Sequence, residues 1–129
     1  MDFEPQYVSL TTDRIEICAS QAFTDEDDCC AYYLKIENNS DAPIMVLGKD
    51  LNITDTQGHH FVTSDHTFKG EILELNPGEY FEFEDMMPTL PGTAVLYGTC
   101  RIIKENRAQD IKIPALELVS SQNSAVVFN

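Results

Sequence analysis

The chain has 129 residues, 43% of them hydrophobic and 23% charged, which predicts one ordinary globular domain and excludes disorder along most of its length. Twenty-two acidic residues against eight lysines and arginines give a formal net charge of -14. Because phosphate groups are neutralised by cationic side chains, nucleic acid and anionic membranes are poor partners for such a chain.

The compartment is indicated by the N-terminal residues and by the cysteines. Residues 1–5 contain neither the basic nor the apolar stretch of a secretory signal, and no apolar run approaches the roughly 18 residues of a membrane span. We therefore expect a cytoplasmic protein. Cys18, Cys29, Cys30 and Cys100 fit no zinc-binding spacing, and in a reducing compartment we expect free thiols.

Alternation of apolar and polar side chains dominates the chain and predicts β-strands, because successive strand residues point to opposite faces of a sheet. In chain order, the clearest alternating runs are residues 13–19, 30–37, 80–84, 94–102 and 111–113. The apolar positions that we expect in the core are Tyr32, Leu34, Ile36, Ile53, Phe81, Phe83, Leu96, Ile111 and Ile113.

Turn signals separate these runs, at residues 38–41, 55–58, 76–78, 88–92 and 104–110. The sharpest is Asn76-Pro77-Gly78-Glu79, in which proline presets one φ angle and glycine permits a positive φ at the next position.

No window shows convincing helical periodicity, so the chain is expected to be all-β. Seven or so short strands predict an antiparallel two-sheet sandwich, formed by one domain over residues 1–120 and followed by a C-terminal tail at 121–129.

Four segments, in this order and at this spacing, carry a resemblance to a known family: residues 31–38 (AYYLKIEN), 53–58 (ITDTQG), 75–83 (LNPGEYFEF) and 113–118 (IPALEL). They resemble the ApaG family. The resemblance implies a fibronectin-III-like or immunoglobulin-like sandwich without known enzymatic activity. ApaG-like domains attached to F-box and polymerase-interacting proteins imply protein binding, and bacterial members imply a link to cobalt and magnesium tolerance.

The chain departs from the family at the Gly-x-Gly-x-x-Gly loop that has been suggested to cradle phosphate. Residues 65–70 read DHTFKG, and only Gly70 matches. A cradle needs glycine so that backbone N–H groups can converge on an anion, and Asp65 adds a negative charge at that place. We therefore expect no tight pyrophosphate or nucleotide binding. The family's Arg-His-Trp is replaced by residues 49–51 (KDL), so any role of that triplet is lost.

The three histidines, His59, His60 and His66, allow two interpretations, of which the first is a metal site. His60 could meet His66, Asp55 or Asp65 across a hairpin, and imidazole with carboxylate suits zinc, nickel or cobalt. The alternative is a polar loop without a metal. We assign no metal ligand.

Other polar clusters are expected to be structural. Residues 25–28 (DEDD) lack the glycine and the ligand spacing of a calcium loop and predict a solvated acidic loop. These carboxylates would raise the thiol pKa values of Cys29 and Cys30, which argues against redox chemistry. Glu82, Glu84 and Asp85 lie on a predicted strand, in which Glu82 and Glu84 share a face, and we expect the carboxylates to be solvated. We assign no catalytic residue and no cofactor.

These observations together favour a non-enzymatic, cytoplasmic binding or adaptor domain with a protein partner, which the net charge predicts to be basic. If the acidic residues on the strand from Tyr80 and at 25–28 converge on one face, that face is the expected interface. The alternative is a small-molecule or divalent-metal-ion binding protein linked to cobalt and magnesium homeostasis. Hydrolysis of a phosphorylated nucleotide is disfavoured by the missing glycines.

Overall fold

The computed structural model describes residues 7–22, 29–63, 65–88 and 93–119, although the side chains of Cys29 and Pro88 are not described. Within these ranges the chain forms nine β-strands and no helix. The strands are β1 (Tyr7–Thr12), β2 (Ile15–Ala22), β3 (Cys29–Asn38), β4 (Ile44–Asp55), β5 (His60–Val62), β6 (Leu73–Leu75), β7 (Tyr80–Pro88), β8 (Thr93–Lys104) and β9 (Arg107–Val119). The number exceeds the expected seven partly because β5 and β6, with three residues each, are too short to show alternation.

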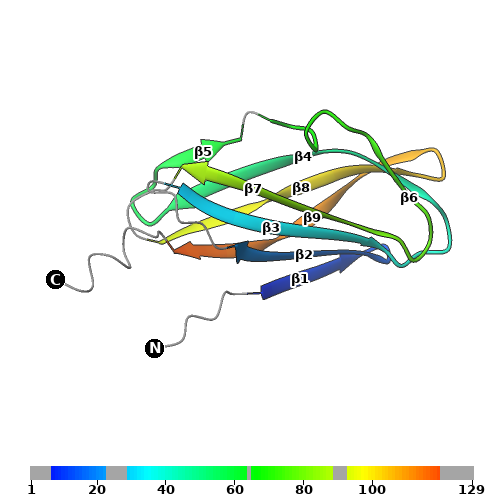
Figure 1. The fold of residues 1–129 in the computed structure, drawn as a ribbon, viewed down its shortest axis with the longest axis horizontal. Helices are drawn as coiled ribbons and strands as arrows, with labels where there is room; N and C mark the ends of the chain where they lie inside the picture. Colours follow the sequence, from blue (N-terminus) through cyan, green and yellow to red (C-terminus); the bar gives the residue numbers. More distant parts are fainter. Residues whose placement is uncertain (1–6, 23–28, 64, 89–92, 120–129) are drawn as a thin grey trace.

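Two antiparallel sheets face each other, which confirms the sandwich (Figure 1). Sheet A has the strand order β1-β2-β3-β7, and sheet B has the order β5-β4-β8-β9 with β6 also paired to β4. β7 is therefore one edge of sheet A, and β5 is one edge of sheet B. These two edge strands lie near each other at one end of the molecule (Figure 1).

The core forms between the inner faces of the two sheets. All nine predicted core residues are buried except Phe81, which is partly buried and packs against the core. Each fully buried side chain of this size contributes roughly 1.5–3 kcal/mol. Because only alternate residues of a strand can face this layer, the sequence alternation predicts it well.

Tight turns join neighbouring strands, and two of them differ from the predicted boundaries. Asp13 was expected in a strand, but Asp13 and Arg14 form a two-residue turn with φ angles of 51° and 63°. The expected turn at 104–110 contains only Glu105 and Asn106, also at 51° and 63°. Such a turn matches the twist of the strands, so the flanking residues stay in the ladder and β9 begins at Arg107.

The predicted turn at Asn76–Glu79 is confirmed. Gly78 has a φ of 87°, and the Glu79 N–H donates to the carbonyl oxygen of Asn76 at 2.9 Å. The C-terminal tail at 121–129 and most of the predicted turn at 88–92 lie outside the described residues, so the domain boundary stays a prediction.

Candidate functional site

A pocket of about 270 Å³ opens between the two sheets where the edge strands β5 and β7 approach each other. We call it the edge pocket. Its lining combines an apolar wall with a few ionisable side chains: Tyr32, Lys49, Ile53, Phe61, Val62, Thr63, Asp65, Asp85, Met86 and Met87. A mostly apolar hollow with a small number of polar groups is the usual form of a ligand site.

Lys49 is a buried cation on the inner face of sheet B. A register shift between Val46 and Gly48 precedes it, and it then shares the inner face of β4 with Leu51 and Ile53. Only 3% of Lys49 is exposed.

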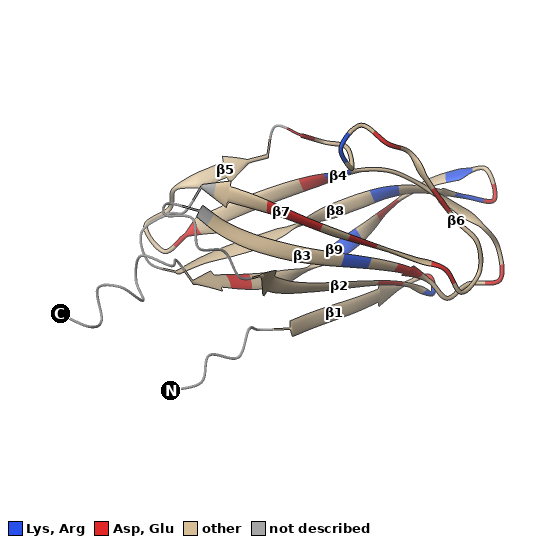
Figure 2. Ribbon diagram, in the orientation of Figure 1, with Lys and Arg blue, Asp and Glu red and all other residues tan. Residues whose placement is uncertain are grey.

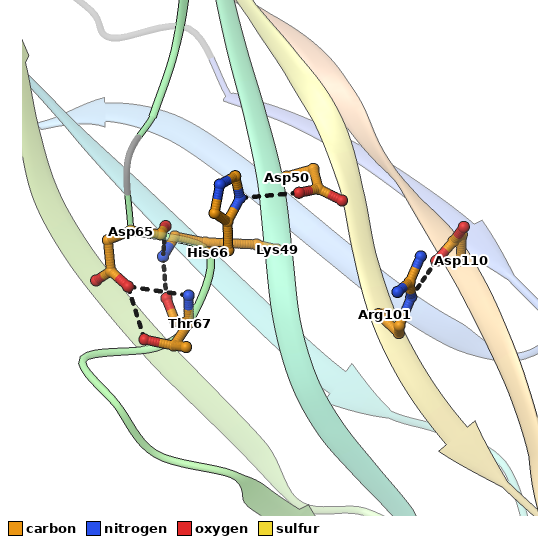
Figure 3. Close-up of polar contacts among 7 residues, drawn as sticks. All are labelled: Lys49, Asp50, Asp65, His66, Thr67, Arg101 and Asp110. Atoms are coloured by element: carbon orange, nitrogen blue, oxygen red, sulfur yellow. Dashed lines mark hydrogen bonds and ion pairs between the residues drawn. The ribbon is translucent and has the colours of Figure 1, made fainter.

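The Lys49 ammonium is held by backbone acceptors and aromatic rings. Nζ donates to the carbonyl oxygen of Asp65 at 3.3 Å and to that of Thr67 (Figure 3). It also lies 4.6 Å from the centroid of the Phe83 ring and 4.9 Å from that of Phe68. Burial lowers the pKa of Lys49, while the carboxylates of Asp65 and Asp85 act in the opposite direction. These contacts offset the high cost of removing an ammonium from water.

The segment after β5 folds around the carboxylate of Asp65. Asp65 Oδ1 accepts hydrogen bonds from the Thr67 hydroxyl at 2.6 Å and the Thr67 N–H at 2.9 Å (Figure 3). Thr67 Oγ1 in turn accepts a hydrogen bond from the Gly70 N–H at 2.7 Å. The Thr67 hydroxyl bond, the backbone bonds and Lys49 lower the pKa of Asp65, against the effect of burial. Backbone N–H groups of this loop thus point at an internal carboxylate. This supports the expectation that the loop binds no phosphate, which stays a prediction.

A hydroxyl group of the edge pocket is buried without a hydrogen bond to the described residues. It is Thr63 Oγ1. Because buried polar groups are nearly always paired, this hydroxyl marks unused hydrogen-bonding capacity. Tyr32 lines the same pocket and is 1% exposed. Burial raises the pKa of Tyr32, and the charges of Asp85 and Asp65 raise it further.

Asp85 faces the edge pocket from β7, directly opposite Tyr32 in the ladder of sheet A. Its Oδ1 accepts the Met86 N–H at 2.8 Å. The expectation of a solvated strand face is wrong for Asp85, because the strand period places it on the inner side of β7 with Phe83, opposite to the face that Glu82 and Glu84 share. Glu82 and Glu84 are exposed as expected, and Glu82 accepts the Tyr33 hydroxyl at 2.7 Å.

Comparison with known proteins identifies the family. No protein-family model matches the chain. Protein ApaG of Agrobacterium fabrum is 29% identical over 122 residues, covering 88% of this chain and 93% of that protein. Protein ApaG of Brucella canis is 30% identical over 88 residues, covering 67% of this chain and 68% of that protein. The chain belongs to the ApaG family.

Solved structures share the sandwich of this ApaG-family chain. The putative ApaA protein from Bordetella pertussis has a TM-score of 0.71 at 20% identity, covering 90% of this chain and 96% of that one. A structural-genomics target solved by X-ray crystallography has a TM-score of 0.76 at 15% identity, covering 88% of this chain and 91% of that one. At these identities the similarity shows the fold.

The histidines of this ApaG-family chain do not gather. Each pairs with an oxygen of its own: His59 with Asp55 at 2.8 Å, His60 with Asn52 at 3.0 Å, and His66 with Asp50 at 3.0 Å. Among the described residues, no three His, Cys, Asp or Glu side chains are placed to hold a metal ion. The combination of His60 with His66 and a carboxylate, left open by the sequence, is thus not formed in this part of the chain.

The cysteines that the structure describes fully are buried. Cys18 and Cys100 are free thiols, and burial raises the pKa of Cys100 to about 12. The Cys30 thiol donates to the carbonyl oxygen of Val119 at 3.7 Å. Their burial fits a structural role. The Cys29 side chain and the acidic residues 25–28 lie outside the described residues.

Charge is distributed over the whole ApaG-family domain. Figure 2 shows acidic residues along β7, on other strands and in several turns, with lysines and arginines between them on both sheets. One cation–anion pair, Arg101 with Asp110 at 3.1 Å, joins β8 to β9 (Figure 3). The described acidic residues therefore do not converge on one face. In the fully described part of the chain, no helix has the length and apolar character needed to cross a membrane.

Proposed function

We propose that this chain is a non-enzymatic binding or adaptor domain of fibronectin-III-like architecture that acts in the cytoplasm on a protein partner of basic character. One observation carries the proposal. Apolar side chains of the edge strands are exposed around the edge pocket: 46% of Phe61, 55% of Val62 and 45% of Met86 reach solvent. Large apolar side chains that gather on a surface mark an interaction site.

The edge strands add backbone hydrogen-bonding groups to this apolar rim. β5 is an edge strand of sheet B, and β7 is an edge strand of sheet A. An edge strand presents N–H and C=O groups that an extended peptide segment can pair with, while side-chain pockets beside it provide specificity. The edge pocket lies between these two strands and fits that mode of recognition.

Charge supports a basic partner. The chain carries a formal net charge of -14, and the edge pocket contains one ammonium, Lys49, against two carboxylates, Asp65 and Asp85. Opposite charge on a partner speeds its diffusional encounter and selects against acidic competitors.

The same pocket offers little for catalysis. The Thr63 hydroxyl has no hydrogen-bonded base among the described residues, and the Lys49 ammonium is bound to backbone carbonyls. A nucleophile needs a base within hydrogen-bond reach to be activated. This supports a binding role.

A pull-down from the native cytosol tests the proposal. We expect Phe61→Glu and Val62→Glu to lose the captured partner, and high salt to weaken capture of the wild-type chain. Tyr7→Glu is the matched control, because Tyr7 is an aromatic residue with 62% exposure on β1, which is the edge of sheet A opposite to β7. A partner that both rim variants retain would overturn the assignment of this surface.

The alternative is binding of a divalent metal ion or a small molecule, linked to cobalt and magnesium homeostasis. Of these two kinds of ligand, only a small molecule is favoured by a specific observation, which is the presence of the edge pocket. Equilibrium dialysis of the chain against cobalt and magnesium, with ligand-free buffer as the control, tests the metal form.

A further inference from the structure

We propose that the edge pocket binds the guanidinium group of an arginine side chain that a partner segment inserts between β5 and β7. This inference rests on the proposed function, since it names the chemical group by which a basic partner is recognised. Four features of the pocket support it: its size, its charge, its unpaired oxygens and its apolar rim.

The size of the edge pocket excludes large ligands. Its volume of about 270 Å³ lies just under the roughly 300–1,000 Å³ of sites for drug-sized molecules. A nucleotide would not be enclosed by it, whereas a single long side chain would.

The charge of the edge pocket favours a cation. Among the lining residues, Asp65 and Asp85 outnumber Lys49, so these three ionised groups leave one negative charge. The Lys69 ammonium, 5.7 Å from the centroid of the Phe83 ring, is not part of the lining. A ligand with one positive charge neutralises it, whereas an anion would add to it. Lys49 is already engaged by the carbonyl oxygens of Asp65 and Thr67 and by two aromatic rings.

The unpaired oxygens favour guanidinium over ammonium. Thr63 Oγ1 is buried without a hydrogen bond, and Asp85 Oδ1 accepts one bond, from Met86, within the described chain. Guanidinium presents five N–H donors in a fixed plane and is weakly hydrated, so it can satisfy several separate acceptors at once. A lysine ammonium has three donors and holds its water more strongly.

The rim of the edge pocket suits the rest of an arginine residue. The three-carbon stem can lie along Phe61, Val62 and Met87 while its charged end reaches the carboxylates. The edge strands β5 and β7 beside the pocket present backbone N–H and C=O groups that an extended segment can pair with. A peptide is therefore favoured over a free alkylguanidine.

Calorimetric titration of the full chain tests the inference with four probes. They are N-acetyl-arginine methylamide, the same derivative of lysine, the same derivative of citrulline, and n-propylguanidine. We expect saturable binding of the arginine derivative with a Kd on the order of 1 mM, as for one well-paired side chain. The lysine derivative and n-propylguanidine should bind several-fold more weakly, and the citrulline derivative, which has the shape without the charge, should not bind.

Three variants locate the site. Asp85→Asn and Thr63→Val should weaken binding of the arginine derivative by about tenfold or more, because each removes an acceptor of the guanidinium. Glu84→Gln is the matched control, since Glu84 precedes Asp85 but lies on the outer face of β7. Thermal unfolding of each variant confirms that it is folded.

The outcomes separate the inference from the proposed function. Equal binding of the citrulline derivative, or unchanged binding by Asp85→Asn, would overturn the guanidinium site. Binding of n-propylguanidine as tight as that of the arginine derivative would show that a peptide backbone does not contribute, and would overturn the inference that a peptide supplies the guanidinium. If Phe61→Glu loses its captured partner while arginine does not bind, only this inference fails. If arginine binds but the rim variants retain the partner, the proposed protein interface fails.

Discussion

The ammonium of Lys49 on sheet B lies 4.6 Å from the centroid of the Phe83 ring on sheet A, so a cation links the two sheets next to the edge pocket. Lys49, like Leu51 and Ile53, points from β4 toward the core. Alternation along the strand predicts an apolar residue at position 49, as at 51 and 53. The lysine is tolerated there because carbonyl oxygens and ring faces replace water around it.

Lys49→Met should change how stability depends on alkaline pH. Burial lowers the pKa of Lys49 in the folded chain below its usual value of about 10.4. At pH values between the folded and the unfolded pKa of Lys49, the unfolded chain binds more protons than the folded chain. The free energy of unfolding of the wild type therefore increases with pH over this range. Methionine keeps the apolar stem and does not titrate, so this contribution should vanish.

The measurement is the difference in unfolding free energy between wild type and Lys49→Met, taken by urea titration at several alkaline pH values. The difference removes the contributions of ionisable groups that the two chains share. Lys112→Met, at an exposed position of β9, is the control and should follow the wild type. A Lys49→Met curve parallel to the wild type would contradict the lowered pKa.

Asn38 should be essential for stability although it lies in a predicted turn. It is fully buried, and its Nδ2 donates to the carbonyl oxygens of Ala42 at 2.8 Å and Leu75 at 2.9 Å. Its Oδ1 accepts from the N–H and the hydroxyl of Ser40. Asn38→Ala leaves these groups unpaired and should cost about 2–4 kcal/mol in chemical denaturation.

Asn39→Ala is the control for Asn38→Ala, because the neighbouring asparagine is exposed and should change stability by less than about 0.5 kcal/mol. Equal losses in the two variants would show that the buried hydrogen bonds of Asn38 are not what stabilises this loop.

Gly78→Val should destabilise the turn through its backbone. Gly78 has a φ of 87°, and no atom lies within 4 Å of the place where its Cβ would stand, so crowding does not contribute. Strain at a positive φ should cost on the order of 1 kcal/mol or more for a β-branched residue. Gly78→Asn should cost less, because asparagine adopts positive φ more readily. Equal loss in both variants, measured by thermal unfolding, would refute this explanation.

The sequence predicts the layers of this fold better than its edge pocket, for a physical reason. Alternation assigns each strand residue to a face, so the core, the two-sheet architecture and even the inward position of Asp85, two residues after Phe83, can be deduced from it. The inward position of Lys49, two residues before Leu51, can be deduced from the alternation in the same way. The position of Asp65 was not, because it depends on how the chain between β5 and β6 folds back onto β4.

The loop at residues 65–70 should not bind phosphate, and Asp65 should be the cause. Its carboxylate already accepts the Thr67 N–H and hydroxyl, which an incoming anion would need, and a second negative charge beside it would be repelled. Calorimetric titration with pyrophosphate or ATP in excess magnesium should show no saturable heat. Micromolar binding of pyrophosphate that Lys69→Ala abolishes would refute the prediction.

Asp65 should also stabilise the fold in a pH-dependent way. Because the hydrogen bonds to Thr67 lower the pKa of Asp65, its contribution to stability is present above the unfolded pKa of about 3.9 and is lost as pH falls through the folded pKa. Asp65→Asn should therefore flatten the acid limb of the stability curve, whereas Glu71→Gln, at an exposed position after the loop, should leave it unchanged.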